Sequence, residues 1–185
     1  MVNLNEGEPV DDALGLIVFR DESARTVAVL LNINGHPEAM WSDNKILTAD
    51  YPGRLCELTE EKFGGGAIFF SADLGAMMSP ARPGPGETHD FARLERISRR
   101  IFQDLERGME RLVEEENPVL VHKLARFLVP IENERFKLLS ETGIIKREVY
   151  EGDHILTQVH LIELGSVQMV TFPGEVYPKM LSLIH

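Results

Sequence analysis

Two apolar runs near the start of the chain constrain its fold more than any other feature. Residues 15–21 read GLIVFRD and residues 26–34 read TVAVLLNIN, with only the polar stretch ESAR between them. Short apolar runs rich in β-branched residues are typical of buried strands, and the short polar connection predicts a hairpin. The second run leads directly into Gly35-His36-Pro37. Histidine is an unusual residue at such a strand end, so His36 is the first candidate for a functional group.

Helical signals alternate with strand signals in the first two thirds of the chain. Asp50 can cap a helix and Pro52 is tolerated in a first turn, so a helix is expected from there to the glycines at 64–66. The run AIFFSA at 67–72 predicts a short buried strand, and an irregular loop rich in proline and glycine follows it. Thr88 then begins the clearest helical pattern, which we expect to fray before Asn117-Pro118 because Glu114 to Glu116 oppose the helix dipole. Its apolar stripe steps by three or four through Phe91, Leu94, Ile97, Ile101, Leu105, Met109 and Leu112.

The remaining third predicts more strands. A strand is expected over 119–131, a short helix over 133–143, two strands around a turn at Gly165, and a terminal helix. The fold class that follows is α/β (or α+β), with a mixed β-sheet flanked by helices in a sandwich-like arrangement. A chain of 185 residues is expected to form a single domain over 1–185.

Composition excludes several classes of function. Nineteen Lys and Arg against 30 Asp and Glu give a net charge of −11, which makes nucleic acid an unfavourable partner. No stretch reaches the roughly 18 apolar residues of a transmembrane segment. The first residues lack the basic start and apolar block of a signal peptide. The lone Cys56 excludes a fold held by internal disulfides. The cellular compartment and the oligomeric state stay open.

Three segments share one pattern: a buried strand, then small or polar residues, then a turn. They read LLNINGHP, IFFSADLGAMMSP and QMVTFPGE. Each places a candidate group just past its strand: His36 in the first, Ser71, Asp73 or Ser79 in the second, and Glu175 in the third. Ligands of open α/β sheets bind outside the carboxyl ends of the strands, so these groups are expected to meet if the strands are neighbours.

Structural roles compete with each of these assignments. His36 is equally explained as a strand-end histidine bonded to a backbone carbonyl, Glu175 as an acid in the first turn of a helix, and Ser79 as a turn residue. His122, His154 and His160 lie on or beside predicted strands, where packing or exposure accounts for them. Imidazole and carboxylate are also usual zinc ligands, but a catalytic zinc takes three protein ligands and only two are nominated here.

The order of the motifs resembles the neutral (non-lysosomal) ceramidase family and its bacterial relatives. The resemblance runs through NINGHP, ILTADYPGRLCELTEEKFGGGAIFFSADLGAMMSP, FLVPIENERF and VQMVTFPGE. It implies a zinc-dependent amidase that hydrolyses the N-acyl bond of a ceramide-like lipid. It also implies that His36 and Glu175 are zinc ligands, and that Ser79 matches the catalytic-site serine of the family's Gly-Asp-x-Ser-Pro stretch.

The departures from that family define the alternatives. The family's first zinc histidine lies upstream of this sequence, its tyrosine ligand lies downstream, and GAMMSP lacks the aspartate of the serine motif. We therefore expect a part of a larger ceramidase-like catalytic domain, with zinc as cofactor in the intact protein and little activity in the 185 residues alone. The alternative is a non-catalytic binding or scaffold domain that keeps the fold with a decayed site.

Overall fold

The computed structural model describes residues 2–3, 12–42, 44–75, 78–80, 84, 86–144, 149–150 and 153–181. Contacts within the chain divide it into two compact units, residues 1–113 with 175–185, and residues 114–174. Each unit is described by itself below. The expectation of a single domain over 1–185 stays a prediction.

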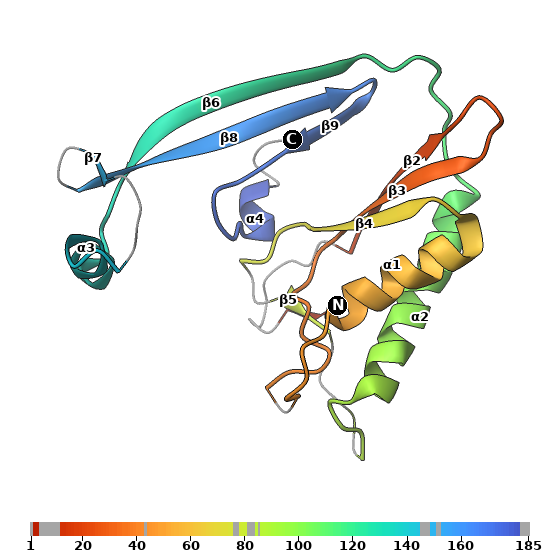
Figure 1. Cartoon of the computed structure of the whole chain (residues 1–185), viewed down its shortest axis with the longest axis horizontal. Helices are drawn as coiled ribbons and strands as arrows, with labels where there is room; N and C mark the ends of the chain where they lie inside the picture. The colour runs from red at the N-terminus through yellow and green to blue at the C-terminus, as the bar shows by residue number, and fades with distance from the viewer. Residues whose placement is uncertain are drawn as a thin grey trace. The chain divides into compact units, whose positions relative to one another are not determined.

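A mixed three-stranded sheet forms the centre of the first unit (Figure 1). β2 (Leu14–Arg20) and β3 (Thr26–Ile33) pair antiparallel, which confirms the predicted hairpin. β4 (Gly66–Ser71) pairs parallel with β3, and α1 (Asp50–Phe63) provides the crossover between them. Because parallel strands need such a crossover, α1 is the element that fixes β4 beside β3.

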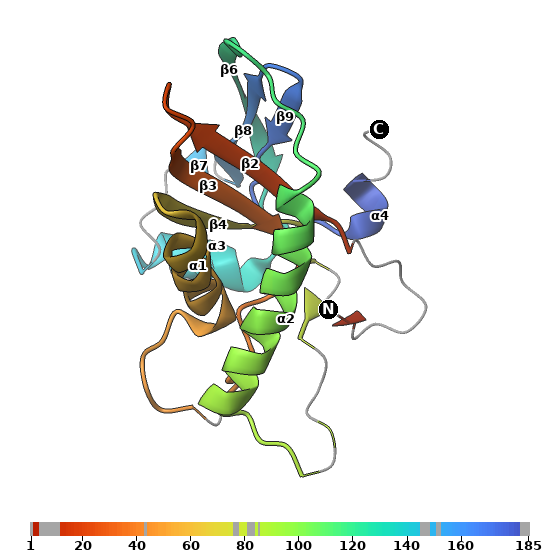
Figure 2. The same cartoon turned by 90° about the vertical axis from the view of Figure 1, so that its right-hand side faces the viewer.

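Two helices cover one face of this sheet. α1 packs against β4, and α2 (Phe91–Met109) packs against β2 and against α1 (Figures 1 and 2). β3 alternates accordingly, since Val29 and Leu31 are fully buried while Asn32, on the opposite face, is exposed. The core beneath the sheet consists of Val29, Leu31, Ile33, Leu55 and Leu105. The predicted helices flanking a mixed sheet are confirmed.

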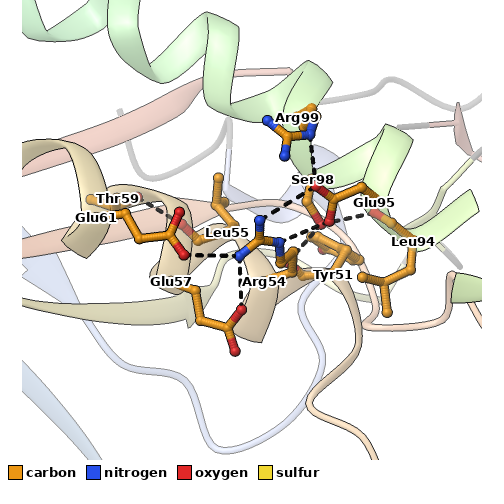
Figure 3. Close-up of polar contacts among 10 residues, drawn as sticks. All are labelled: Tyr51, Arg54, Leu55, Glu57, Thr59, Glu61, Leu94, Glu95, Ser98 and Arg99. Carbon is orange, nitrogen blue, oxygen red and sulfur yellow. Dashed lines mark hydrogen bonds and ion pairs between the residues drawn. The ribbon is translucent and has the colours of Figure 1, made fainter. Parts of the chain in front are cut away.

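A network of charged side chains joins α1 to α2 (Figure 3). Arg54 Nε donates to Glu95 Oε2 at 2.8 Å, and its Nη1 donates to both Glu57 and Glu61. The hydrogen bond to Glu95 is the main cause that raises the pKa of Arg54, and the same bond lowers the pKa of Glu95. Ser98 Oγ donates to the carbonyl of Leu94 beneath this network. Glu57 and Glu61 are exposed, and ion pairs at the surface each contribute little free energy.

The ends of α2 differ from the predicted ones. Asp90, not Thr88, caps the helix, because its carboxylate accepts from the backbone N–H of Arg93 at 2.9 Å. The Thr88 hydroxyl in turn donates to Asp90. The helix also ends at Met109, well before Asn117. Gly108 marks that end, where a Cβ would lie only 2.6 Å from Leu16 Cδ1, so the last turn lies close against β2.

The second unit is a sheet of long antiparallel strands. β6 (Leu120–Pro130) pairs with β8 (His154–Leu164) along their whole length, and β9 (Val167–Val170) extends the sheet. The turn between β8 and β9 contains Gly165 at φ +57°, as predicted. β7 (Val149–Tyr150) pairs with the start of β8, and α3 (Glu134–Glu141) is capped by Asn133.

Short elements complete the described chain. β1 (Val2–Asn3) pairs with β5 (Met78–Ser79), and α4 (Pro178–Leu181) is the observed part of the predicted terminal helix. Ala76 and Met77 of the GAMMSP stretch and residues 182–185 lie outside the described residues. None of the described helices has the length and apolar character needed to cross a bilayer.

The close approach of Gly65 to β3 gives a test of the first unit. Gly65 has φ +70°, and a Cβ there would lie 2.5 Å from the carbonyl oxygen of Val27. Gly65→Ala is therefore expected to lower the free energy of unfolding by about 1–3 kcal/mol. Gly66→Ala is the matched control, because no atom lies within 4 Å of its Cβ position. Urea unfolding of both variants measures the difference, and equal stabilities would contradict this packing.

Candidate functional site

The carboxyl ends of β3 and β4 meet, as the sequence predicts for neighbouring parallel strands. Ile33 is in register with Ser71, and the backbone N–H of Ala72 donates to the carbonyl of Ile33 at 3.0 Å. The residues that follow the two strands are joined by Asn34 Nδ2, which donates to Asp73 Oδ1 at 2.7 Å. Both side chains are buried, with 2% and 3% exposure. A buried polar pair thus lies at the edge where the candidate groups were expected.

His36 and Glu175 lie next to each other. His36 Nε2 is 3.5 Å from Glu175 Oε1, with the imidazole 18% exposed and the carboxylate 60% exposed. The two residues are far apart in sequence and come from different segments of the first unit. The structure therefore brings together both residues nominated as metal ligands.

Glu175 reaches His36 by a route that the strand pattern did not predict. The strand before it, β9, belongs to the sheet of β8 and does not pair with β3 or β4. Glu175 is instead placed by the loop after β4, because the backbone N–H of Gly75 donates to the carbonyl of Val176 at 3.0 Å. A Cβ on Gly75 would lie 2.7 Å from the carbonyl oxygen of Glu175, so glycine is needed for this close approach.

Ser79 is bound to a residue that the sequence reasoning missed. Its buried hydroxyl donates to Glu38 Oε2 at 2.5 Å, a short hydrogen bond to a charged acceptor. Glu38 lies two positions after His36, and its backbone N–H donates to the carbonyl of His36 at 2.9 Å. Its place beside a candidate histidine was the available sequence signal. One loop thus carries both His36 and the partner of Ser79.

We call residues 34–41 the His36 loop; a buried carboxylate holds it in place. Asp50 accepts from the backbone N–H of Ala39 at 2.9 Å and of Met40 at 3.0 Å. Asp50 is 6% exposed and has φ +53°, a strained conformation for a residue other than glycine. The predicted role of Asp50 as the cap of its own helix is wrong, since Ala49 occupies that position. Asp50 serves the preceding loop as well as the first turn of α1.

Tyr51 supports the same loop from α1. Its hydroxyl donates to the carbonyl of Gly35 at 3.0 Å, and the ring is fully buried. Burial is the main cause that raises the pKa of Tyr51, and the negative charges of Asp50 and Glu38 raise it further. The phenol therefore stays protonated and keeps its hydrogen bond across the physiological range of pH.

The start of α2 completes the support of the loop. Arg93 Nε donates to the carbonyl of Ala39 at 3.2 Å, and His89 Nδ1 lies at the same distance from that oxygen. The ring of His89 also lies 6.1 Å from that of Trp41, at the end of the His36 loop. His89 precedes α2, one position before the capping residue Asp90.

The donor set at His36 fits two positions of a zinc site. Two ligands of a tetrahedral zinc at 2.0–2.1 Å lie about 3.3 Å apart, close to the 3.5 Å between His36 Nε2 and Glu175 Oε1. Neutral imidazole and carboxylate are also the ligand types that zinc accepts. Within the ranges that the structure describes, no three or more His, Cys, Asp or Glu residues are grouped so as to hold a metal ion. The pair alone does not complete a catalytic site.

Comparison with known proteins gives a match in structure and none in sequence. No protein-family model matches the chain, and no curated protein sequence matches it significantly. The chain is similar to the crystal structure of neutral ceramidase from Pseudomonas aeruginosa, with a TM-score of 0.69 and 15% identity. It is also similar to the structure of a ceramidase complexed with C2, with a TM-score of 0.69 and 14% identity. The fold is ceramidase-like.

The chain spans only part of those proteins. The two matches cover 91% of this chain, but 35% and 37% of the chains that they match. The described units therefore correspond to roughly a third of a ceramidase structure, and the likeness concerns the fold.

Asp50 offers a test of how the His36 loop is held. Asp50→Ala removes the acceptor of three buried backbone N–H groups, those of Ala39, Met40 and Tyr51, so the free energy of unfolding is expected to fall by about 2–4 kcal/mol. Asp50→Asn keeps one acceptor oxygen and is expected to cost less. Asp104→Ala on the exposed side of α2 is the control, with a change within about 0.5 kcal/mol. Chemical unfolding measures all three, and a neutral Asp50→Ala would contradict the assigned role.

Proposed function

We propose that this chain is part of a zinc-dependent hydrolase that cleaves the N-acyl amide bond of a lipid-like substrate. The observation that carries the proposal is the contact between His36 Nε2 and Glu175 Oε1. The sequence nominated both residues as metal ligands, and they meet on a ceramidase-like fold. The substrate class is inferred from the ceramidases that share this fold.

His36 and Glu175 would hold the metal ion in this proposal. The neutral imidazole would supply Nε2 and the carboxylate an anionic oxygen, and when bound the ion supplies a water of lowered pKa and polarises the amide carbonyl. The His36 loop fixes the backbone of His36 through Asp50 and Tyr51, so the imidazole is preorganised before any ligand binds.

Ser79 is proposed as the catalytic side chain and Glu38 as the residue that positions it. The Ser79 proton is directed to the Glu38 carboxylate, which leaves the lone pairs of Oγ available on its other sides. A hydroxyl hydrogen-bonded to a carboxylate carries more negative charge on oxygen, so it interacts better with an electron-poor carbonyl carbon. Glu38 thereby both orients and activates the Ser79 hydroxyl.

The 185 residues alone are expected to have little or no amidase activity. A catalytic zinc needs three protein ligands, and we propose that the intact protein supplies the others from outside this sequence. The chain spans about a third of the ceramidases that it resembles in structure, which agrees with that proposal.

One observation favours a second function. The stretch GAMMSP lacks the aspartate of the ceramidase serine motif, as expected for a non-catalytic binding or scaffold domain with a decayed site. The two functions differ in what the intact protein does to an N-acyl sphingoid amide. Hydrolysis supports the enzyme, whereas binding without hydrolysis supports the scaffold.

Zinc binding at His36 is expected to depend on how Glu175 is placed. Titration of the chain with ZnCl₂ should shift the imidazole resonances of His36, and Glu175→Gln should weaken that response at least about tenfold. Gly75→Ala should weaken it as well, because its new Cβ would force the Glu175 segment away while both ligands remain. Gly84→Ala, with its nearest neighbouring atom 3.9 Å away, is the control. A His36 response that Glu175→Gln leaves unchanged would overturn the shared site.

Ser79 and Glu38 are expected to act as one unit in the intact protein. Ser79→Ala and Glu38→Gln should each lower kcat by on the order of 10²-fold, the scale of a positioned catalytic group. The double variant should be no slower than the slower single variant, because both changes remove the same interaction. Glu132→Gln, at an exposed position in the second unit, serves as control. Losses that multiply in the double variant would show that the two residues act separately.

A further inference from the structure

Two histidines of the second unit lie on one face of its sheet. In the antiparallel pairing of β6 with β8, His122 is opposite Ile162 and Leu124 is opposite His160. Residues that are paired, or two apart along a strand, point to the same face. His122 and His160 are therefore diagonal neighbours, a relation in which side chains reach each other.

The two imidazole rings meet edge to edge. His122 Nε2 lies 2.8 Å from His160 Nδ1, the ring centroids are 5.1 Å apart, and the ring planes differ by only 13°. Near-parallel planes would also fit stacked rings. In stacked rings, however, the two nitrogens would not lie on the line between ring centroids that are 5.1 Å apart, as a nitrogen–nitrogen distance of 2.8 Å requires here. The rings are close to coplanar, and each contact nitrogen points at the other. One nitrogen donates a hydrogen and the other offers its lone pair.

We propose that His122 and His160 form a binding site for a late first-row divalent metal ion, separate from the His36–Glu175 pair. The ion would replace the shared hydrogen and take one nitrogen lone pair from each ring. Imidazole is a good ligand for zinc, copper and nickel and a poor one for magnesium and calcium. Water would fill the remaining positions of the ion.

The required change in the pair is small. Two ligands of a tetrahedral zinc lie about 3.3 Å apart, so the nitrogens must separate by roughly 0.5 Å while the rings turn toward the ion. His122 is exposed and His160 is partly exposed, so the rings have room to turn. The backbone beneath them is held by the pairing of β6 with β8, and the N–H of His160 donates to Thr171 Oγ1 at 3.1 Å. Fixed backbones reduce the entropy lost when the ion binds.

The net charge of the chain favours a cation. The chain carries a net charge of −11, which raises the local concentration of cations. Lys123 occupies the opposite face of β6, where it pairs with Glu163 at 2.7 Å. Arg126 shares the face of the histidines: it is opposite Gln158 and therefore a diagonal neighbour of His160, on the side away from His122.

Isothermal titration with ZnCl₂ and with NiCl₂ tests the proposal on the full 185-residue chain. The background carries His36→Ala and Glu175→Gln, which removes the first pair of ligands. In that background we expect binding of both ions. His122→Ala and His160→Ala should each weaken the affinity at least about tenfold, because the loss of a group that merely supports a metal ligand already has an effect of that size. His154→Ala, on the same strand and paired with Asp153, is the control and should leave the affinity unchanged.

Glutamine variants distinguish the loss of a metal ligand from a loss of folding. His122→Gln and His160→Gln keep a polar side chain at each position and remove only the imidazole, so they should weaken binding as the alanine variants do. Circular dichroism verifies that each variant is folded. Absence of zinc and nickel binding in the background would overturn the proposal and leave the pair as a hydrogen bond between strands. Binding that survives either substitution would also overturn it, and MgCl₂ should give no binding.

Discussion

The parallel pairing of β3 with β4 determines where the candidate groups of the first unit lie. It requires a crossover, and α1 fills that role while it packs against β4 and adds Leu55 to the core formed by β3. The segments that follow β3 and β4 also leave the sheet at the same edge, so that Asn34 and Asp73 meet there as a buried pair. The loop after β4 continues from this pair to Gly75, which in turn holds the segment of Glu175. One strand pairing thus positions residues from three separate parts of the sequence.

The His36 loop is held through its backbone. Asp50 binds the N–H groups at Ala39 and Met40, and Tyr51 binds the carbonyl at Gly35. These supporting groups are buried, and buried hydrogen bonds to a carboxylate are costly to break. The loop is therefore held by hydrogen bonds to its backbone, which leaves the side chains of His36 and Glu38 available for other contacts. A loop held through its backbone, with its functional side chains left available, is typical of preorganised sites.

The sequence predicted the features that depend on periodicity and strand order. The β2–β3 hairpin, α1, the stripe of α2 and the place of His36 just past β3 follow from apolar patterns and from where strands end. The contact of His36 with Glu175 depends instead on the loop at Gly75. The link between Ser79 and Glu38 could not be predicted, because it depends on β1 and β5, two-residue strands that carry no periodic signal. The role of Asp50 in binding the His36 loop depends on its positive φ, which cannot be predicted from the residue type. The start of α2 was misplaced because Thr88 and Asp90 are both good capping residues.

Trp41 is the single tryptophan of the chain, and it lies at the end of the His36 loop with its ring near that of His89. Its indole is 45% exposed, so the wavelength of its emission follows the hydration of this one position. Because the second unit contains no tryptophan, excitation selective for tryptophan gives no emission from it. The protein therefore contains a built-in optical probe of the loop that carries His36 and Glu38. Rearrangement of that loop by a ligand, and unfolding of the first unit, can both be followed without a label.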